Sequence, residues 1–127
     1  MHLFNLRVYY EDTDLAGIVY YANYLKFIER ARSEWVRDLG IDQAQMKAEG
    51  LVFAVRRVVA DYLLPARYDD LLCVETKLLP GSGARLVLQQ DVKRGDATLF
   101  SATVTIICMT TDGAMTRLPA AIRQAMD

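Results

Sequence analysis

The sequence predicts an α+β fold in which a five-stranded, largely antiparallel sheet wraps around one long helix. Only one segment, 22–39, repeats apolar residues at the spacing of a long helix. The other long apolar segments have strand length, and most of them alternate apolar with polar residues. Short turns containing glycine, proline or aspartate connect them. One strand, one long helix and then four strands in this order give a sheet packed around the helix.

The N-terminal third contains the first strand and the helix. A strand is expected at 3–10. Its inward face is expected to be Phe4, Leu6, Val8 and Tyr10. Helix 22–39 should end at Gly40, because glycine readily adopts the left-handed conformation that follows many helices. A second, short helix is expected at 42–49, with Asp42 as its N-terminal cap.

The strand predicted at 51–64 is apolar on both of its alternating faces. One face is expected to carry Val52, Ala54, Val58, Ala60 and Tyr62, and the other Phe53, Val55, Val59 and Leu63. A strand of this kind is covered on both sides. We expect the long helix on one side and a partner subunit on the other.

Three more strands and a terminal helix complete the chain. They are expected at 71–79, 85–93, 99–111 and 120–126, separated by turns at 65–70, 80–83, 94–96 and 112–113. The inward faces of the three strands are expected to be Leu72, Val74, Thr76 and Leu78, then Leu86, Leu88 and Val92, then Phe100, Ala102, Val104, Ile106 and Cys108. Pro119 suits a helix start, where its missing N–H is harmless.

Composition limits the classes of function. A chain of 127 residues has the length of a single domain, and we expect one domain over 1–127. The net charge is -1 and no run of basic residues is longer than Arg56-Arg57, which argues against a nucleic-acid partner. Hydrophobic residues make up 53%, slightly more than usual for a small domain, which suggests surface buried in an oligomer.

The apolar runs, the two cysteines and the single histidine bear on the compartment and on possible cofactors. No apolar run has the length of a transmembrane helix and no signal-peptide pattern is present, so a cytoplasmic protein is expected. Cys73 and Cys108 lie in apolar strand patterns, which favours two buried thiols in a reducing compartment and leaves a disulfide open. His2 is the only histidine, which argues against Ser/His and Cys/His catalysis and histidine-based metal motifs. We therefore expect no metal or organic cofactor.

Residues 10–24 read Y-E-D-T-D-L-A-G-I-V-Y-Y-A-N-Y and lead into the long helix. Glu11, Asp12 and Asp14 place three carboxylates within four residues, and Gly17 gives the backbone freedom to bend after them. A carboxylate can then lie beside the free N–H groups of the helix start, which stabilise developing negative charge. A substrate carbonyl held between the two would face a base on one side and an oxyanion site on the other.

The pattern Y-x-D-T-D-x-A-G-I-V-Y-x-x-N-Y, followed by F-I-E-R-A-R and P-A-R-Y-D-D-L-L, resembles the hotdog-fold thioesterases of the 4-hydroxybenzoyl-CoA thioesterase family. Within that family it most resembles the Tol-Pal-associated acyl-CoA thioester hydrolases. The resemblance covers nearly the whole chain. It implies the hotdog fold and hydrolysis of acyl-CoA to free acid and thiol, with acyl carrier protein as an alternative carrier.

The resemblance also implies roles for individual residues. Asp14 matches the catalytic carboxylate, the backbone N–H of Tyr21 matches the oxyanion donor, and Asp12 matches a supporting residue. Some relatives have histidine where Tyr21 stands, so the role carried over is that of the backbone. Further substrate contacts are implied for Gly17, Val19, Tyr24 and Arg85.

The site for the CoA phosphates is less directly implied. In some relatives, basic residues in the turn before the fourth strand meet these phosphates. Here that turn is P-G-S-G at 80–83, and only Arg85 lies near it. The glycines could cradle a phosphate, but no helix and no P-loop lysine follow them, so we interpret the segment as a hairpin turn.

Other interpretations of the acidic residues stay open. Aspartates beside glycine often form turns or caps, and this applies more to Asp12 than to Asp14, whose motif favours catalysis. Glu29 and Glu34 would ordinarily pair with Arg32, Arg30 and Arg37 at spacings of three and four residues on the helix. Other hotdog thioesterases resemble one another in using a helix glutamate, so Glu29 is the reserve catalyst. Because a thiol has a pKa of about 8.5, the leaving thiolate needs little help from an acid. Asp14 alone could then serve, as general base or as nucleophile.

Two rival functions are less well supported by the residues. A non-catalytic acyl-CoA or acyl-carrier-protein binding protein is disfavoured by the intact Asp14, and a hotdog dehydratase is disfavoured because His2 is badly placed as a base. The resemblance further implies a homodimer whose sheets join edge to edge with active sites at the seam, or a homotetramer of paired dimers. We expect at least a dimer and favour the tetramer of paired dimers, because one helix can cover only one face of the sheet.

Overall fold

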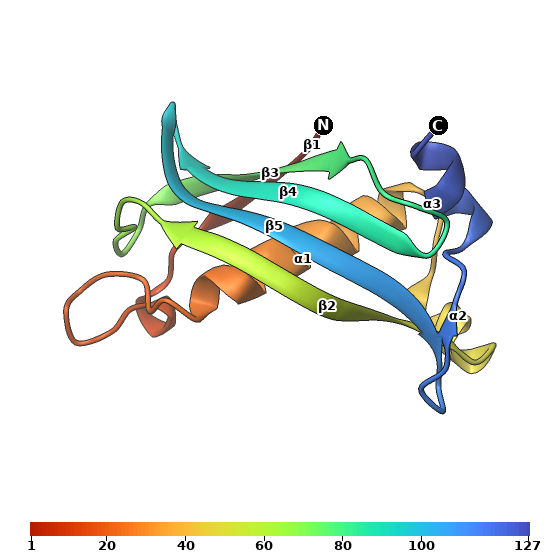
Figure 1. The fold of residues 1–127 in the computed structure, drawn as a ribbon. Helices are drawn as coiled ribbons and strands as arrows, with labels where there is room; N and C mark the ends of the chain where they lie inside the picture. Colours follow the sequence, from red (N-terminus) through yellow and green to blue (C-terminus); the bar gives the residue numbers. More distant parts are fainter.

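The computed structural model describes residues 1–127 and contains one sheet with a long helix packed against it (Figure 1). The strands are β1 (His2–Arg7), β2 (Leu51–Tyr62), β3 (Leu71–Leu79), β4 (Arg85–Arg94), β5 (Ala97–Thr110) and β6 (Met115–Thr116). The helices are α1 (Asn23–Asp38), α2 (Gln43–Ala48) and α3 (Ala120–Ala125), with a 3-10 turn at Tyr10–Asp12. The predicted α+β fold, a sheet around one long helix, is confirmed.

The strands run antiparallel throughout, in the spatial order β1-β3-β4-β5-β2. Strands β1 and β2 therefore form the two edges. The short β6 pairs with Cys108 and Met109 of β5, beyond Ile107, where the pairing of β5 with β4 ends. The prediction of five strands missed β6, because two residues are too few to show an alternation.

The first strand is shorter than predicted. It ends at Arg7, and Tyr10 lies in the 3-10 turn with 84% of its surface exposed. The reason is a local hydrogen bond, because the Asp12 carboxylate accepts from the backbone N–H of Tyr9 at 2.8 Å. That bond curls the backbone and takes Tyr10 away from the inward face to which the alternation assigned it.

Strand β2 contains a bulge that the sequence pattern did not reveal. Val55 pairs with Ile106, but the next pair is Arg57 with Thr105, so Arg56 is an extra residue. An extra residue reverses which side chains face the core. The face toward the helix is therefore Phe53, Val55, Val58, Ala60 and Tyr62. Each predicted face therefore combines inward residues from one side of the bulge with outward residues from the other, and is wrong in one half. The outer face also includes the charged residues Arg57 and Asp61.

The long helix covers little of β2, which it meets at one end through Tyr24 and Tyr62. It packs against β1, β3 and β4, while the short α2 lies against one end of β2 (Figure 1). In the middle of β2, Val58 is 39% exposed and Val59 is 50% exposed. The expectation that the helix covers this strand is wrong, and β2 is an edge strand with exposed apolar side chains.

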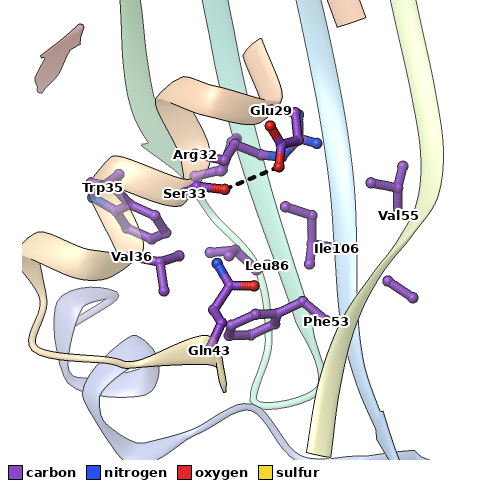
Figure 2. A pocket seen from close by; sticks show the side chains of 12 residues that line it. Glu29, Arg32, Ser33, Trp35, Val36, Gln43, Phe53, Val55, Leu86 and Ile106 are labelled. Atoms are coloured by element: carbon purple, nitrogen blue, oxygen red, sulfur yellow. Dashed lines mark hydrogen bonds between the residues drawn. The ribbon is translucent and has the colours of Figure 1, made fainter. Parts of the chain in front are cut away.

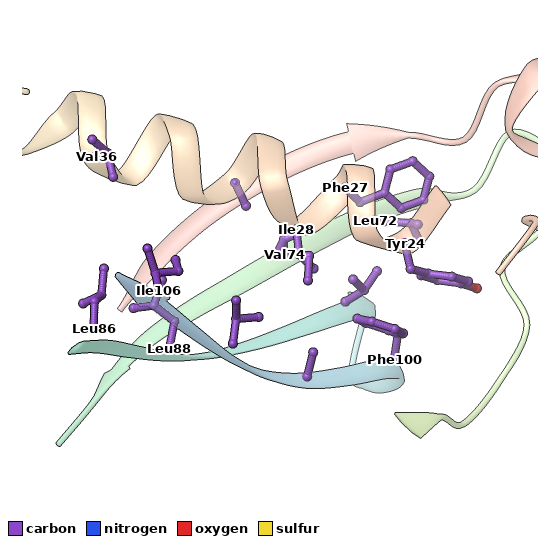
Figure 3. Close-up of a cluster of buried hydrophobic side chains, with 14 of the residues drawn as sticks. Tyr24, Phe27, Ile28, Val36, Leu72, Val74, Leu86, Leu88, Phe100 and Ile106 are labelled. Atoms are coloured by element: carbon purple, nitrogen blue, oxygen red, sulfur yellow. The ribbon is translucent and has the colours of Figure 1, made fainter. Parts of the chain in front are cut away.

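The core lies between α1 and the inward face of the sheet (Figure 3). The helix contributes Tyr24, Phe27, Ile28, Ala31 and Val36, and the predicted inward faces of β3, β4 and β5 are all confirmed as buried, except that Leu78 is only partly so. Gln90 also lies in this core with none of its surface exposed, although the pattern did not mark it. Its amide donates to the Ile28 carbonyl and to the Thr76 hydroxyl, each at 3.0 Å.

The helix ends and the cysteines follow from simple rules. Gly40 has φ +85° directly after α1, and the Asp42 carboxylate accepts from the backbone N–H groups of Ala44 and Gln45, as predicted for a cap. Both thiols are free; Cys108 is buried as predicted, whereas Cys73 is only half-buried. None of the helices combines the length and the apolar character required to cross a membrane.

The buried layer yields a stability prediction. Leu88 is fully buried on β4, whereas Leu3 is 56% exposed on the edge strand β1. We expect Leu88→Ala to lower the free energy of unfolding by about 2–5 kcal/mol, because the change removes buried methyl groups and leaves a cavity. The matched control Leu3→Ala should cost less than about 1 kcal/mol. Urea unfolding at one protein concentration measures both, and equal losses would contradict this account of the core.

Candidate active site

The segment between β1 and α1 forms a tight loop around Asp14. The backbone N–H of Asp14 donates to the Ile18 carbonyl, and the N–H of Gly17 donates to the Asp14 carbonyl, each at 2.9 Å. Gly17 has φ +79°, a conformation that other residues adopt only with strain. The bend predicted at Gly17 is confirmed, and it returns the chain to the start of α1.

The Asp14 side chain is half-buried, and only one of its two carboxylate oxygens has a hydrogen-bond partner. Its Oδ1 accepts a hydrogen bond from the backbone N–H of Ala16 at 2.9 Å, which fixes the carboxylate in an Asx-type turn. No group of the chain donates to its Oδ2. One carboxylate oxygen is thus anchored and the other is available to a substrate or to water.

The peptide between Tyr20 and Tyr21 is held at the helix start. The Tyr20 carbonyl accepts from the backbone N–H of Asn23 at 2.8 Å, and in a helical peptide the N–H points the opposite way, past the N-terminus. The Tyr21 N–H has no acceptor within the chain. From β2, the Tyr62 hydroxyl donates to the Tyr21 carbonyl at 3.0 Å. Burial raises the pKa of Tyr62, so its phenol remains a donor.

A pocket of about 390 Å³ joins these groups. It is lined by Asp14, Ile18, Val19, Tyr20, Tyr21, Tyr24, Tyr62, Leu63, Leu64 and Pro65. Two predicted contact residues form its inner wall, because Val19 and Tyr24 are each 3% exposed. The Tyr24 ring stacks on Phe100 with 5.0 Å between centroids, and its hydroxyl accepts from the Ala66 N–H. Sequence reasoning missed the wall from Tyr62 to Pro65, which is distant from the motif along the chain.

The chain is similar to known proteins over most of its length. Residues 8–126 match the model of the thioesterase-like superfamily. The chain is 43% identical to the acyl-CoA thioesterase YbgC of Haemophilus influenzae over 107 residues, which are 84% of this chain and 79% of that protein. It is 41% identical to the acyl-CoA thioester hydrolase YbgC of Escherichia coli O157:H7 over 105 residues, 82% of this chain and 78% of the relative.

Among solved structures, a probable thioesterase from Bartonella henselae has a TM-score of 0.89 at 39% identity, covering 93% of this chain and 98% of its own. The chain belongs to the thioesterase-like superfamily. The resemblance stated from the sequence is therefore confirmed, together with the hotdog fold that it implied.

In this thioesterase Asp12, a second acidic residue of the motif, forms hydrogen bonds that hold the backbone. The Asp12 carboxylate holds the N–H of Tyr9, and the Asp12 carbonyl accepts from the N–H of Tyr20 at 2.9 Å and from the side-chain amide of Asn23 at 2.9 Å. These bonds position the helix start that carries the Tyr21 N–H. The placement agrees with the supporting role implied for Asp12.

Two predicted residues lie elsewhere in the single chain. Glu29 lines a different pocket on α1 and accepts from the Ser33 hydroxyl at 3.2 Å, so its expected pairing with Arg32 is absent. Arg85 pairs with Ile107 at the opposite end of the sheet, seven β5 residues or about 23 Å from the Phe100 end. Neither residue meets Asp14 within one chain.

A salt bridge supports the pocket from behind. The turn after β2 contributes Ala66, whose carbonyl accepts from the Val19 N–H at 2.9 Å. That turn is held by Asp70, which accepts from the Arg67 N–H at 2.9 Å and from the Arg94 guanidinium at 2.8 Å. Burial alone would raise the pKa of Asp70, but these two hydrogen bonds outweigh it and hold the pKa below its ordinary value of 3.8.

The Asp70 interaction predicts a dependence of stability on pH. A carboxyl group with a lowered folded-state pKa stabilises the fold above its unfolded pKa, and loses that effect as the pH falls through the folded pKa. We expect Asp70→Asn to cost about 1–3 kcal/mol at pH 7, and the difference from wild type to shrink below about pH 4. Urea unfolding across a pH series tests this, with the exposed Asp96→Asn as control; a loss that does not change with pH would contradict it.

Proposed function

We propose that this chain hydrolyses the thioester of acyl-CoA to a free acid and a thiol, with Asp14 as the catalytic carboxylate. The observation that carries the proposal is that a free carboxylate oxygen of Asp14 and the unpaired N–H of Tyr21 belong to the same pocket. A thioester carbonyl between them meets a base or nucleophile on one side and a hydrogen-bond donor on the other. The acyl-CoA activity named for the YbgC relatives supports CoA as carrier.

Two routes fit this arrangement. In the first, Asp14 takes a proton from water as the water oxygen attacks the carbonyl, and the Tyr21 N–H stabilises the negative charge on the carbonyl oxygen. The C–S bond then breaks and the thiolate leaves with the bond pair. In the second, the Asp14 oxygen attacks, the thiolate leaves from a mixed anhydride, and water hydrolyses that anhydride. Both routes need only one carboxylate.

Alternative functions of the same pocket make different demands. Acyl carrier protein could deliver the same thioester through an identical pantetheine arm. A protein that only binds acyl-CoA would need the apolar wall but no free carboxylate oxygen beside the scissile carbonyl. The availability of Asp14 Oδ2 therefore favours turnover over binding.

We propose further that the working unit is at least a homodimer joined along β2. This strand is an edge of twelve residues whose middle exposes apolar side chains, and such edges pair with another chain unless they are protected. Antiparallel pairing of two copies of β2 around a two-fold axis would extend both sheets into one. It would also bring the Arg85 end of one protomer toward the Asp14 pocket of its partner.

The outer face of the sheet gives weaker support for a tetramer of paired dimers. It was expected to be apolar, but its centre carries a hydrogen-bonded polar cluster of Gln89, Asp91, Ser101 and Thr103. A polar face of this kind tolerates water. The argument for self-association therefore rests on the β2 edge and favours the dimer.

The catalytic proposal predicts a specific loss of turnover. Asp14→Asn keeps the size of the side chain but removes the base, so we expect kcat to fall about 10²–10⁴-fold with unchanged thermal unfolding. Thiol release from acyl-CoA measures this, and Asp96→Asn in the exposed β4–β5 turn is the matched control. Full activity of Asp14→Asn would refute the assignment and make Glu29 the next candidate.

A separate prediction follows from the expectation of no metal cofactor: prolonged chelation should leave wild-type activity unchanged.

The dimer proposal predicts the effect of charge on the edge. Lysines at Val58 and Val59 in both copies would place like charges across the paired strands. We expect wild type to sediment at a multiple of the 14.4 kDa chain mass, and the double variant at that mass with little activity. Leu3→Lys on the opposite edge should change neither property. A wild-type species of single-chain mass with full activity would overturn both the dimer and the shared site.

A further inference from the structure

A second pocket lies between α1, α2 and the sheet, and it shares no residue with the Asp14 pocket (Figure 2). Its walls are mostly apolar, from Trp35 and Val36 on α1, Phe53 and Val55 on β2, and Leu86, Leu88 and Ile106 on β4 and β5. Its volume is about 200 Å³. Engineered apolar cavities of about 150 Å³ accept benzene, so this pocket has room for a short acyl group.

Arg32 is a cation in this apolar pocket without an anionic partner. No carboxylate lies within ion-pair distance of its guanidinium, and its one hydrogen bond runs from Nη1 to the Gln90 side-chain oxygen at 3.1 Å. The nearby carboxylate of Glu29 instead accepts from the Ser33 hydroxyl. A guanidinium has five N–H donors, so most of the donors of Arg32 have no acceptor within the chain.

The structure fixes this guanidinium in place. The Gln90 amide nitrogen is held by the Ile28 carbonyl and by the Thr76 hydroxyl, so its oxygen must face Arg32. Burial lowers the pKa of Arg32, and the charge of Glu29 opposes that shift. An arginine nevertheless stays protonated in proteins. A positioned, partly desolvated positive charge is costly unless a ligand compensates it.

We propose that this pocket receives the far end of the acyl group and that Arg32 binds a carboxylate there. The preferred substrates are then CoA thioesters of short dicarboxylic acids, with about four to six carbons. The inference rests on the proposed function and on the β2 dimer. Phe53 and Val55 line this pocket at one end of β2 and Tyr62 lines the Asp14 pocket at the other, so antiparallel pairing sets this pocket beside the partner's Asp14 pocket.

Ligand binding tests the pocket without any turnover. Trp35 is the only tryptophan of the chain and lines the pocket, so its fluorescence reports occupancy. Pentanoate and pentanamide have the same shape and differ in charge. We expect wild type to bind pentanoate about tenfold or more tightly, because a hydrogen-bonded charge pair is worth at least that factor. Arg32→Gln should remove the difference, and Arg30→Gln, an exposed change on the same helix, should retain it.

Turnover tests the link to the proposed function. Adipoyl-CoA and hexanoyl-CoA match in length, and we expect wild type to favour adipoyl-CoA about tenfold in kcat/KM, a ratio that collapses in Arg32→Gln and persists in Arg30→Gln. If neither substrate is hydrolysed, the proposed function is refuted. The fluorescence titration then still tests whether the pocket binds a carboxylate. Equal binding of pentanoate and pentanamide by wild type, or a wild-type preference for hexanoyl-CoA, overturns the role of Arg32 even if the Arg32→Gln variant fails to fold.

Discussion

The burial of one helix stripe against the sheet positions everything else in this thioesterase. Phe27, Ile28 and Ala31 are each at most 1% exposed, and the two large side chains, Phe27 and Ile28, each contribute about 1.5–3 kcal/mol when they leave water. That packing fixes the rotation and the starting point of α1. Tyr21 therefore keeps its place in the wall of the Asp14 pocket, because the helix that follows it is held against the sheet. The chemistry depends on a contact that contains no reactive group.

The same constraint explains why strand β2 is left largely uncovered in a single chain. One helix of 16 residues covers β1, β3 and β4, and no second helix of comparable length exists to cover β2. The bulge at Arg56 divides the strand further, because it changes the phase of the side chains halfway along. What remains is an apolar edge with one pocket at each end. The proposed two-fold axis, perpendicular to that edge, would protect the strand and bring unlike pockets together in a single step.

Sequence reasoning succeeded where the determinants are local. The alternation in β3, β4 and β5 predicted their buried faces, and the motif predicted the bend at Gly17. It failed where a long-range contact decides the outcome. The bulge in β2 shows only in its register with β5. Gln90 could not be recognised as a core residue, because its partners Ile28 and Thr76 lie on other elements.

That division between local and distant determinants has a consequence for how this fold can diversify. The Asp14 carboxylate, the turn at Gly17 and the start of α1 come from one short segment, and that segment is held by the packing of α1 and by bonds to Tyr62 and Ala66. The walls of both pockets come from strands and helix positions far away in the sequence. Substitutions there would change the shape and charge of either pocket without altering the sequence of the Asp14 segment. Arg32 is only partly buried and Gln90 is fully buried, so their hydrogen bond places one polar interaction at the edge of the apolar core, where a substitution would change the charge of the pocket between α1 and the sheet.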